Sequence, residues 1–209
     1  MTNANGALGG LGFGSAFAEA IMRMDLPRLT PMPSPDRILA LDGLWKFTAA
    51  PASGWTGAPF PSPAPITVPG ERVQQGYSAA PGSTAGYRQV FGVPGTWAGM
   101  RVKLRLEAVY SQSVVHVNGR AAGSHLGGFT PHEIDVTDAV RPGEDNVLAV
   151  LVTSEGPADR ASFASAYAAH PLGGITGSVR LFAVPGLHVR RSANPHEFRL
   201  RFRRRDAAP

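Results

Sequence analysis

Apolar and charged side chains alternate through residues 101–109 of this 209-residue chain. The apolar positions are Val102, Leu104 and Leu106, and the charged ones are Arg101, Lys103, Arg105 and Glu107. Because side chains two apart share one face of a β-strand, this repeat predicts a strand with one face in a hydrophobic core and the other toward solvent. No stretch of ten residues elsewhere favours a helix.

Other segments indicate the same fold class. Asn118-Gly119 predicts a hairpin, because a type I′ turn needs positive φ at both central residues. Residues 146–153 are almost continuously apolar and predict a central strand covered on both faces, and residues 177–184 predict the last strand. The 25 glycines and 19 prolines favour many short strands. We expect an all-β antiparallel sandwich with long loops at one end and Trp45 and Trp97 in its core.

The sequence divides into three parts. Residues 1–37 end in a Pro-rich run and are expected to be a flexible leader and linker, with order beginning at residue 38. Residues 38–185 form the predicted sandwich, and residues 186–209 contain two strand patterns that would begin an immunoglobulin-like domain. Residues 6–18 resemble the apolar part of a signal peptide, but no Lys or Arg precedes them. This favours a cytoplasmic location; a periplasmic or secreted one would require a misplaced start codon.

The formal net charge of +5 resides at the C-terminal end. Residues 186–209 carry seven arginines against two acidic side chains, whereas residues 1–185 carry 13 basic and 13 acidic side chains. A nucleic-acid-binding domain should present a basic face on its folded body, so we interpret this tail as solvated and expect no nucleic-acid partner. No run of 18 apolar residues occurs, and we expect no membrane association.

Motifs for the common catalytic chemistries do not occur in the sequence. It has no dinucleotide fingerprint, no Walker loop, no nucleophile elbow and no cysteine. Its six histidines form no H-x-H or H-E-x-x-H pair. The motifs therefore give no support for a catalytic residue or a cofactor, and we predict no metal site, although metal ligands could still be brought together in space by the fold.

Residues 124–146 look most like an active site, because they hold two histidines and five carboxylates. Glu133 and Asp135 would share one strand face, and a glycosidase needs two carboxyl groups about 5 to 9.5 Å apart. We prefer a structural interpretation. Asp135 or Thr137 can cap a turn, and the Asp and Asn of residues 141–146 can bond to their own backbone.

Five strings in order carry a family resemblance. They are LDGLWKF (41–47), ITVPGE (66–71), GYRQVFGVPGTWAGMRVKLRLEAVYSQSVVHVNG (86–119), GSHLGGFTPHEIDVTDAVRPGEDNVLAV (123–150) and GGITGSVRLFAVP (173–185). Together they resemble the N-terminal sugar-binding domain of glycoside hydrolase family 2, which includes β-galactosidases, β-glucuronidases and β-mannosidases. The resemblance covers residues 38–185 and implies a jelly-roll, galactose-binding-like sandwich, in agreement with the strand pattern.

In that family the domain precedes an immunoglobulin-like domain and a TIM barrel that carries both catalytic glutamates. The resemblance therefore implies a non-catalytic, carbohydrate-associated domain of enzymes that hydrolyse O-glycosyl bonds. We expect a truncated or split family member that is inactive alone. Its expected partners are weakly bound β-glycosides and either the missing barrel or another chain that contacts residues 187–203.

The resemblance also implies a sugar contact in the loop before the GGIT strand, where relatives often place an acidic residue. This chain has no carboxylate beside that strand. We assign the contact to Tyr167, which can stack on a sugar, to His170, which can hydrogen bond, and to Gly174; the alternative is that Tyr167 and His170 only pack the loop. Relatives often carry Arg where this chain has Gly177; such an Arg would anchor the loop before the strand, so we expect looser packing of that loop.

Two further interpretations stay open. Trp55 or Trp97 could stack on a sugar, although Trp97 is also assigned to the core. The domain could instead be a structural or interaction module, in which the C-terminal hairpin with Phe198 and Phe202 pairs with another chain.

Overall fold

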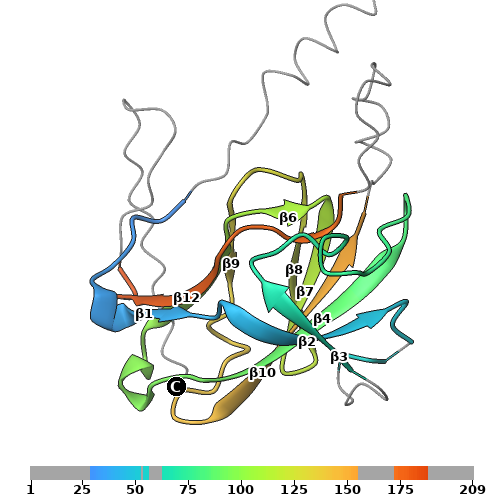
Figure 1. The fold of residues 1–209 in the computed structure, drawn as a ribbon. Coiled ribbons are helices and arrows are strands. Elements are labelled where there is room, and N and C mark those ends of the chain that lie inside the picture. Colours follow the sequence, from blue (N-terminus) through green and yellow to red (C-terminus); the bar gives the residue numbers. More distant parts are fainter. Residues whose placement is uncertain (1–28, 53, 57–62, 155–171, 188–209) are drawn as a thin grey trace, which may run out of the picture.

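The computed structural model describes residues 29–52, 54–56, 63–154 and 172–187 (Figure 1). Tyr167 and His170 lie outside these residues, and so does the C-terminal hairpin apart from Leu187. The roles predicted for them, and the division of the chain into three parts, therefore remain predictions.

Strands make up nearly all of the regular structure (Figure 1). They are β1 (Ile38–Ala40), β2 (Gly43–Ala49), β3 (Ala64–Val68), β4 (Thr84–Gly92), β5 (Arg101–Leu106), β6 (Val109–Tyr110), β7 (Gln112–Val117), β8 (Arg120–Leu126), β9 (His132–Asp135), β10 (Asp145–Thr153), β11 (Gly174–Ile175) and β12 (Val179–Val184). The helices within the described residues are two short 3₁₀ turns, η1 (Pro35–Arg37) and η2 (Gly95–Trp97).

All the strand pairs are antiparallel. One sheet has the order β1-β12-β5-β9 and the other the order β3-β2-β4-β10-β7-β8, while β11 and β6 form a short separate pair. The apolar faces of the two main sheets share a single core. The predicted all-β antiparallel sandwich is therefore confirmed, and the strand order fits the jelly-roll connectivity that the resemblance implies.

Strand β10 is central in the larger sheet. It pairs with β4 along its whole length and with β7 from Leu148 to Thr153. Leu148, Val150 and Val152 are fully buried. Burying a side chain of this kind contributes about 1.5–3 kcal/mol, so the near-continuous apolar run stabilises the middle of the sheet. The prediction of a central strand over residues 146–153 is confirmed.

The hairpin between β7 and β8 has the predicted turn. Asn118 has φ 52° and Gly119 has φ 78°, as a type I′ turn requires. The side-chain amide of Asn118 donates to Asn146 Oδ1 and to the Ala139 carbonyl, each at 2.8 Å, and its oxygen accepts the Val147 N–H at 2.9 Å. The turn is therefore fixed to the start of β10 as well as to its own strands.

The tryptophans separate into core and surface positions. Trp45 is 1% exposed and Trp97 is 3% exposed, which confirms that both fill the core. Neither ring is presented to a sugar, so the stacking role considered for Trp97 is wrong. Trp55 is half-buried and covers β4, since a Cβ on Gly86 would lie 3.1 Å from its ring. The stacking role of Trp55 remains a prediction.

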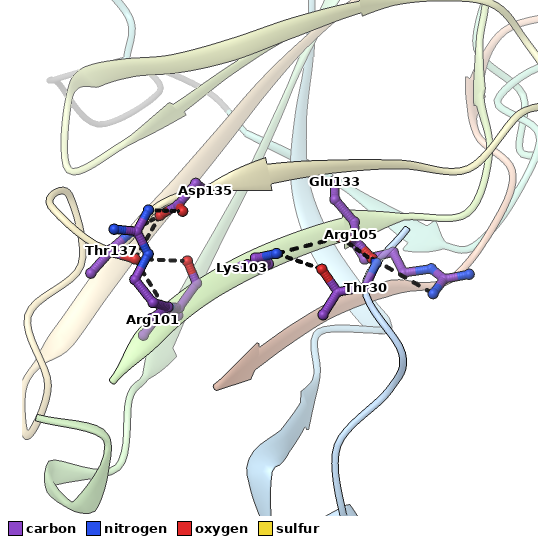
Figure 2. A network of polar contacts seen from close by, with 8 residues as sticks. Thr30, Arg101, Lys103, Arg105, Glu133, Asp135 and Thr137 are labelled. Carbon is purple, nitrogen blue, oxygen red and sulfur yellow. Dashed lines mark hydrogen bonds and ion pairs between the residues drawn. The ribbon is translucent and has the colours of Figure 1, made fainter. Parts of the chain in front are cut away.

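The middle of the charged face of β5 is covered, although the alternation predicts that this face points into solvent. Lys103 is only 1% exposed, because Thr30 lies against it and accepts a hydrogen bond from Lys103 Nζ (Figure 2). Glu133 of β9 lies 4.0 Å from the same Nζ. A two-residue period tells which face a side chain takes but not what covers that face. Defined packing therefore begins before residue 38, where order was expected to start.

Candidate functional site

The two carboxylates that suggested catalysis both have structural partners. Glu133 accepts the Thr30 backbone N–H with both oxygens, at 2.8 and 2.9 Å, and lies 3.8 Å from an Arg105 nitrogen. Asp135 pairs with Arg101, and its Oδ1 accepts the Thr137 hydroxyl at 2.6 Å and the Thr137 N–H at 3.2 Å (Figure 2). The side chain of Glu133 is 4% exposed. Neither carboxylate is directed toward a site for substrate.

The charge on Asp135 is stabilised locally. Partial burial acts to raise the pKa of this carboxyl, but the hydrogen bonds from Thr137 and the pairing with Arg101 outweigh it and hold the pKa below its ordinary value. Asp135 is therefore an ionised turn cap at neutral pH rather than a proton donor. The structural interpretation of this residue is confirmed.

The turn after β9 also follows the structural interpretation. Asn146 Oδ1 accepts the Arg141 N–H at 2.8 Å, and its amide donates to the carbonyls of Arg141 at 3.0 Å and Glu144 at 2.9 Å. One side chain thus closes the whole RPGEDN turn. The predicted bonding of Asn146 to neighbouring backbone is confirmed.

The loop that joins β8 to β9 packs on an aromatic ring. A Cβ on Gly128 would lie 2.9 Å from Tyr110 Cε2, so only glycine allows the loop backbone to approach this closely. The Phe129 ring lies 5.4 Å from the Tyr110 ring, yet the Phe129 side chain is 72% exposed. The loop therefore presents an apolar side chain outward.

Of the three residues predicted to contact sugar, Gly174 lies within the described structure. It is buried, pairs with Tyr110 through the β11–β6 ladder, and has φ 130°. A Cβ there would lie 2.9 Å from the Gly70 carbonyl oxygen and 3.3 Å from the Arg72 nitrogen. In this structure Gly174 permits a close backbone approach and has no open side toward solvent. Its proposed contact with sugar remains untested.

A buried polar cluster lies beneath this glycine. Arg72 is 1% exposed, and Tyr87 and Ser154 are fully buried. One Arg72 terminal nitrogen donates to Ser83 Oγ at 2.6 Å, while Arg72 Nε and Ser154 Oγ have no hydrogen-bond partner within the described structure. Burial lowers the pKa of Arg72, and burial raises the pKa of Tyr87.

Sequence reasoning missed this cluster. The sequence offered one signal for a functional role of Arg72, which is that it directly follows the family string ITVPGE. Its partner Ser83 lies 11 positions further along the chain, and the buried Ser154 lies 82 positions further, at spacings that match no motif.

The packing at Gly177 itself is tight, while most of the loop expected to pack loosely lies outside the described residues, so that expectation remains a prediction. The N–H groups of Thr176 and Gly177 both donate to the Ala108 carbonyl, at 3.1 and 3.0 Å. A Cβ on Gly177 would lie 2.8 Å from Glu107 Cβ. The glycine therefore allows two backbones to meet where a larger residue could not fit.

The described residues do not assemble a metal site. Across 29–52, 54–56, 63–154 and 172–187, no three His, Cys, Asp or Glu side chains lie close enough together to hold an ion. In the same part of the chain, no helix has the length and apolarity needed to cross a membrane.

Comparison with known proteins assigns the fold to a family. The model of the family "Glycosyl hydrolases family 2, sugar binding domain" matches residues 38–185. A β-glucuronidase from Paenibacillus borealis is 34% identical over 122 residues, which are 54% of this chain and 20% of that protein. A β-galactosidase from Thermoanaerobacter pseudethanolicus is 39% identical over 69 residues, 32% of this chain and 9% of that protein.

Solved structures show the same relationship. The β-glucuronidase of Bifidobacterium dentium, complexed with coumarin-3-O-glucuronide, is 27% identical with a TM-score of 0.59, over 76% of this chain and 32% of that one. A Ruminococcus gnavus β-glucuronidase, in complex with N1-substituted uronic isofagomine, shares the fold at 22% identity and a TM-score of 0.65, over 78% of this chain and 33% of that one. This chain thus spans about a third or less of these relatives. The chain belongs to glycosyl hydrolases family 2, and residues 38–185 are the family's sugar-binding domain.

Proposed function

We propose that this sandwich is a non-catalytic module that holds a weak β-glycoside contact beside the catalytic domain of a family 2 hydrolase. β-Glucuronides and β-galactosides are the proposed ligands, because the similar proteins are a β-glucuronidase and a β-galactosidase. The observation that carries the proposal is the anchoring of both residues that flank the segment 155–171.

Both anchors lie on the segment 70–83. The Gly82 N–H donates to the Ser154 carbonyl at 2.7 Å, and the Ser154 N–H donates to the Ser83 carbonyl at 3.0 Å. The Arg72 N–H donates to the Gly173 carbonyl at 2.8 Å, and the Gly173 N–H donates to Glu71 Oε1 at 3.2 Å. The described residues on both sides of the segment 155–171 are therefore held by the same stretch of chain, which suits a segment that presents side chains to a ligand.

Tyr167 and His170 lie in the segment between these anchors and are the proposed contacts. A phenol ring can cover the apolar face of a pyranose, and an imidazole can donate or accept a hydrogen bond with a hydroxyl. Two such contacts offset little of the entropy lost on binding, so we expect weak affinity for the isolated chain.

A catalytic domain is the proposed partner. The chain covers 20% of the Paenibacillus borealis β-glucuronidase and 32% of the Bifidobacterium dentium chain. In this arrangement the sandwich supplies a substrate contact, and the carboxylates that cleave the glycosidic bond belong to the partner. Glu133 and Asp135 support this assignment, since both are engaged in structural ion pairs.

Chemical-shift titration of the full 209-residue chain tests the proposal. Methyl β-glucuronide and methyl β-galactoside should each give a saturable change at millimolar concentration, and the Tyr167→Ala and His170→Ala variants should weaken it. The matched control is His116→Ala, on β7. The chain should not hydrolyse aryl β-glycosides. A titration with no saturable change, or equal binding by all variants, contradicts the proposed contact.

A further inference from the structure

The seam between strands β8 and β9 is closed by two stacked imidazoles. The His125 and His132 rings lie 4.0 Å apart, with 11° between their planes. His125 belongs to β8, the last strand of the larger sheet, and His132 belongs to β9, the last strand of the smaller sheet. The stack therefore joins the two sheets at their edges, next to the loop that connects β8 to β9.

Other side-chain contacts lie beside the stack at this seam. Ile134 of β9 packs against Gly123 of β8, since a Cβ built on that glycine would lie 3.1 Å from Ile134 Cγ2. Strands β8 and β9 belong to different sheets, so no backbone ladder joins them. Side-chain contacts, the two rings among them, therefore close the seam between these strands.

His132 is poorly placed to carry a charge. It is 5% exposed, and neither ring nitrogen has a hydrogen-bond partner within the described structure. Its strand partner on β5 is Leu106. The charged form of His125 is the electrostatic neighbour that disfavours a proton on His132. Glu133 engages Thr30, Lys103 and Arg105 instead.

The polar neighbours of His125 are also uncharged. Its Nε2 lies 3.1 Å from Thr130 Oγ1, and its pairing partner on β7 is Ser113. No carboxylate among the described groups therefore faces the stack to compensate a second proton.

We propose that the His125–His132 stack is an acid-sensitive latch that holds β8, β9 and their connecting loop together at neutral pH and releases them on protonation. The released loop includes Phe129, the exposed apolar side chain described above. The latch rests on the geometry of this seam and does not depend on sugar binding.

Burial, with the neighbouring His125, lowers the pKa of His132 from 6.5 to about 4, although the Thr130 backbone acts to raise it; burial also lowers the pKa of His125. When the seam opens, water reaches the two imidazoles, and their pKa values return to the ordinary value for histidine. The open form then binds a proton more readily than the closed form, and acid shifts the population toward it. Between pH 7 and pH 5, the open population should rise roughly 20-fold.

Hydrogen exchange of the full chain, corrected for the intrinsic effect of pH, tests the latch. Amides of residues 124–132 should exchange roughly 20-fold faster at pH 5 than at pH 7, while amides of β10 stay protected. The His132→Phe variant keeps an aromatic ring and should lose this pH dependence. The His116→Gln variant should keep it. Exchange in the native chain that does not change with pH, or the same change in His132→Phe, overturns the proposal.

A second measurement needs no variant. NMR titration of the imidazole Cε1–H of His132 in the native chain should give a pKa well below that of an exposed histidine. A value near 6.5 would show that the closed seam tolerates the proton and would also overturn the proposal.

Discussion

Both carboxylate oxygens of Glu133 accept the backbone N–H of Thr30, although the two residues lie 103 positions apart. The same carboxylate faces Lys103 and Arg105 of β5, so three segments meet on the outer side of the smaller sheet (Figure 2). Lys103 is almost fully buried, and its charge is balanced by this carboxylate. The contact of Glu133 with Thr30 therefore holds the N-terminal segment over the outer face of the smaller sheet.

Removing the charge on Glu133 should destabilise the fold. Glu133→Gln leaves Lys103 buried beside a neutral amide, and breaking a buried pair of this kind costs about 3 kcal/mol. The matched control is Glu144→Gln, whose pair with Arg141 is 61% and 58% exposed and should change stability by less than about 0.5 kcal/mol. Urea unfolding monitored by circular dichroism gives both values. Equal midpoints for the two variants would refute the role of Glu133.

Stability should fall with acid in two separate windows. The folded-state pKa of His132 is lowered from 6.5 to about 4. The contribution of neutral His132 to the free energy of unfolding is therefore complete above pH 6.5 and is lost as the pH falls toward 4. The full loss is about 3 kcal/mol. The pKa of Asp135 is held below 3.8, so its contribution is lost only at lower pH. Urea midpoints measured from pH 7 to pH 4 should decline for the native chain and decline less for His132→Phe, which keeps only His125.

A methyl group at Gly128 should strain the β8–β9 loop. The added carbon would overlap the Tyr110 ring, and overpacking of this kind costs about 1–3 kcal/mol. Gly186→Ala is the control, because nothing lies within 4 Å of a Cβ at that position. Thermal unfolding compares the two. The interpretation fails if Gly128→Ala melts at the native temperature.

Two substitutions at Asn118 separate backbone strain from hydrogen bonding. Asn118→Gly keeps the positive φ but loses the side-chain bonds to Ala139, Asn146 and Val147, and should cost about 1–2 kcal/mol. Asn118→Ala loses the same bonds and adds the steric cost of a left-handed residue, about 1 kcal/mol more. Denaturant unfolding measures the difference. Equal losses would mean that the turn conformation contributes no strain.

Local patterns predicted the parts of this fold that depend on local geometry. The Asn118-Gly119 pair specifies its own turn, and the alternation in β5 specifies which side chains enter the core. Lys103 marks the limit of this reasoning. Its burial depends on Thr30, 73 positions earlier, and no period in the sequence reveals a contact of that separation.

The candidate sites show the same limit. His125 and His132 stand seven positions apart and match no ligand spacing, because their stacking arises where two sheet edges meet. Arg72 lies in a loop, and its environment comes from residues 83, 87 and 154. Sequence could identify the family and the inward faces of the strands. It could not identify polar groups brought together by tertiary packing.

The anchoring of Ser154 and Gly173 on a common support has an evolutionary consequence. The contacts of Ser154 and Gly173 with residues 71–83 tie the end of β10 and the start of β11 to the same part of the sandwich. Under the proposed function, substitutions in residues 155–171 could then change ligand preference while these anchors are retained, so that one scaffold could serve enzymes with different sugars.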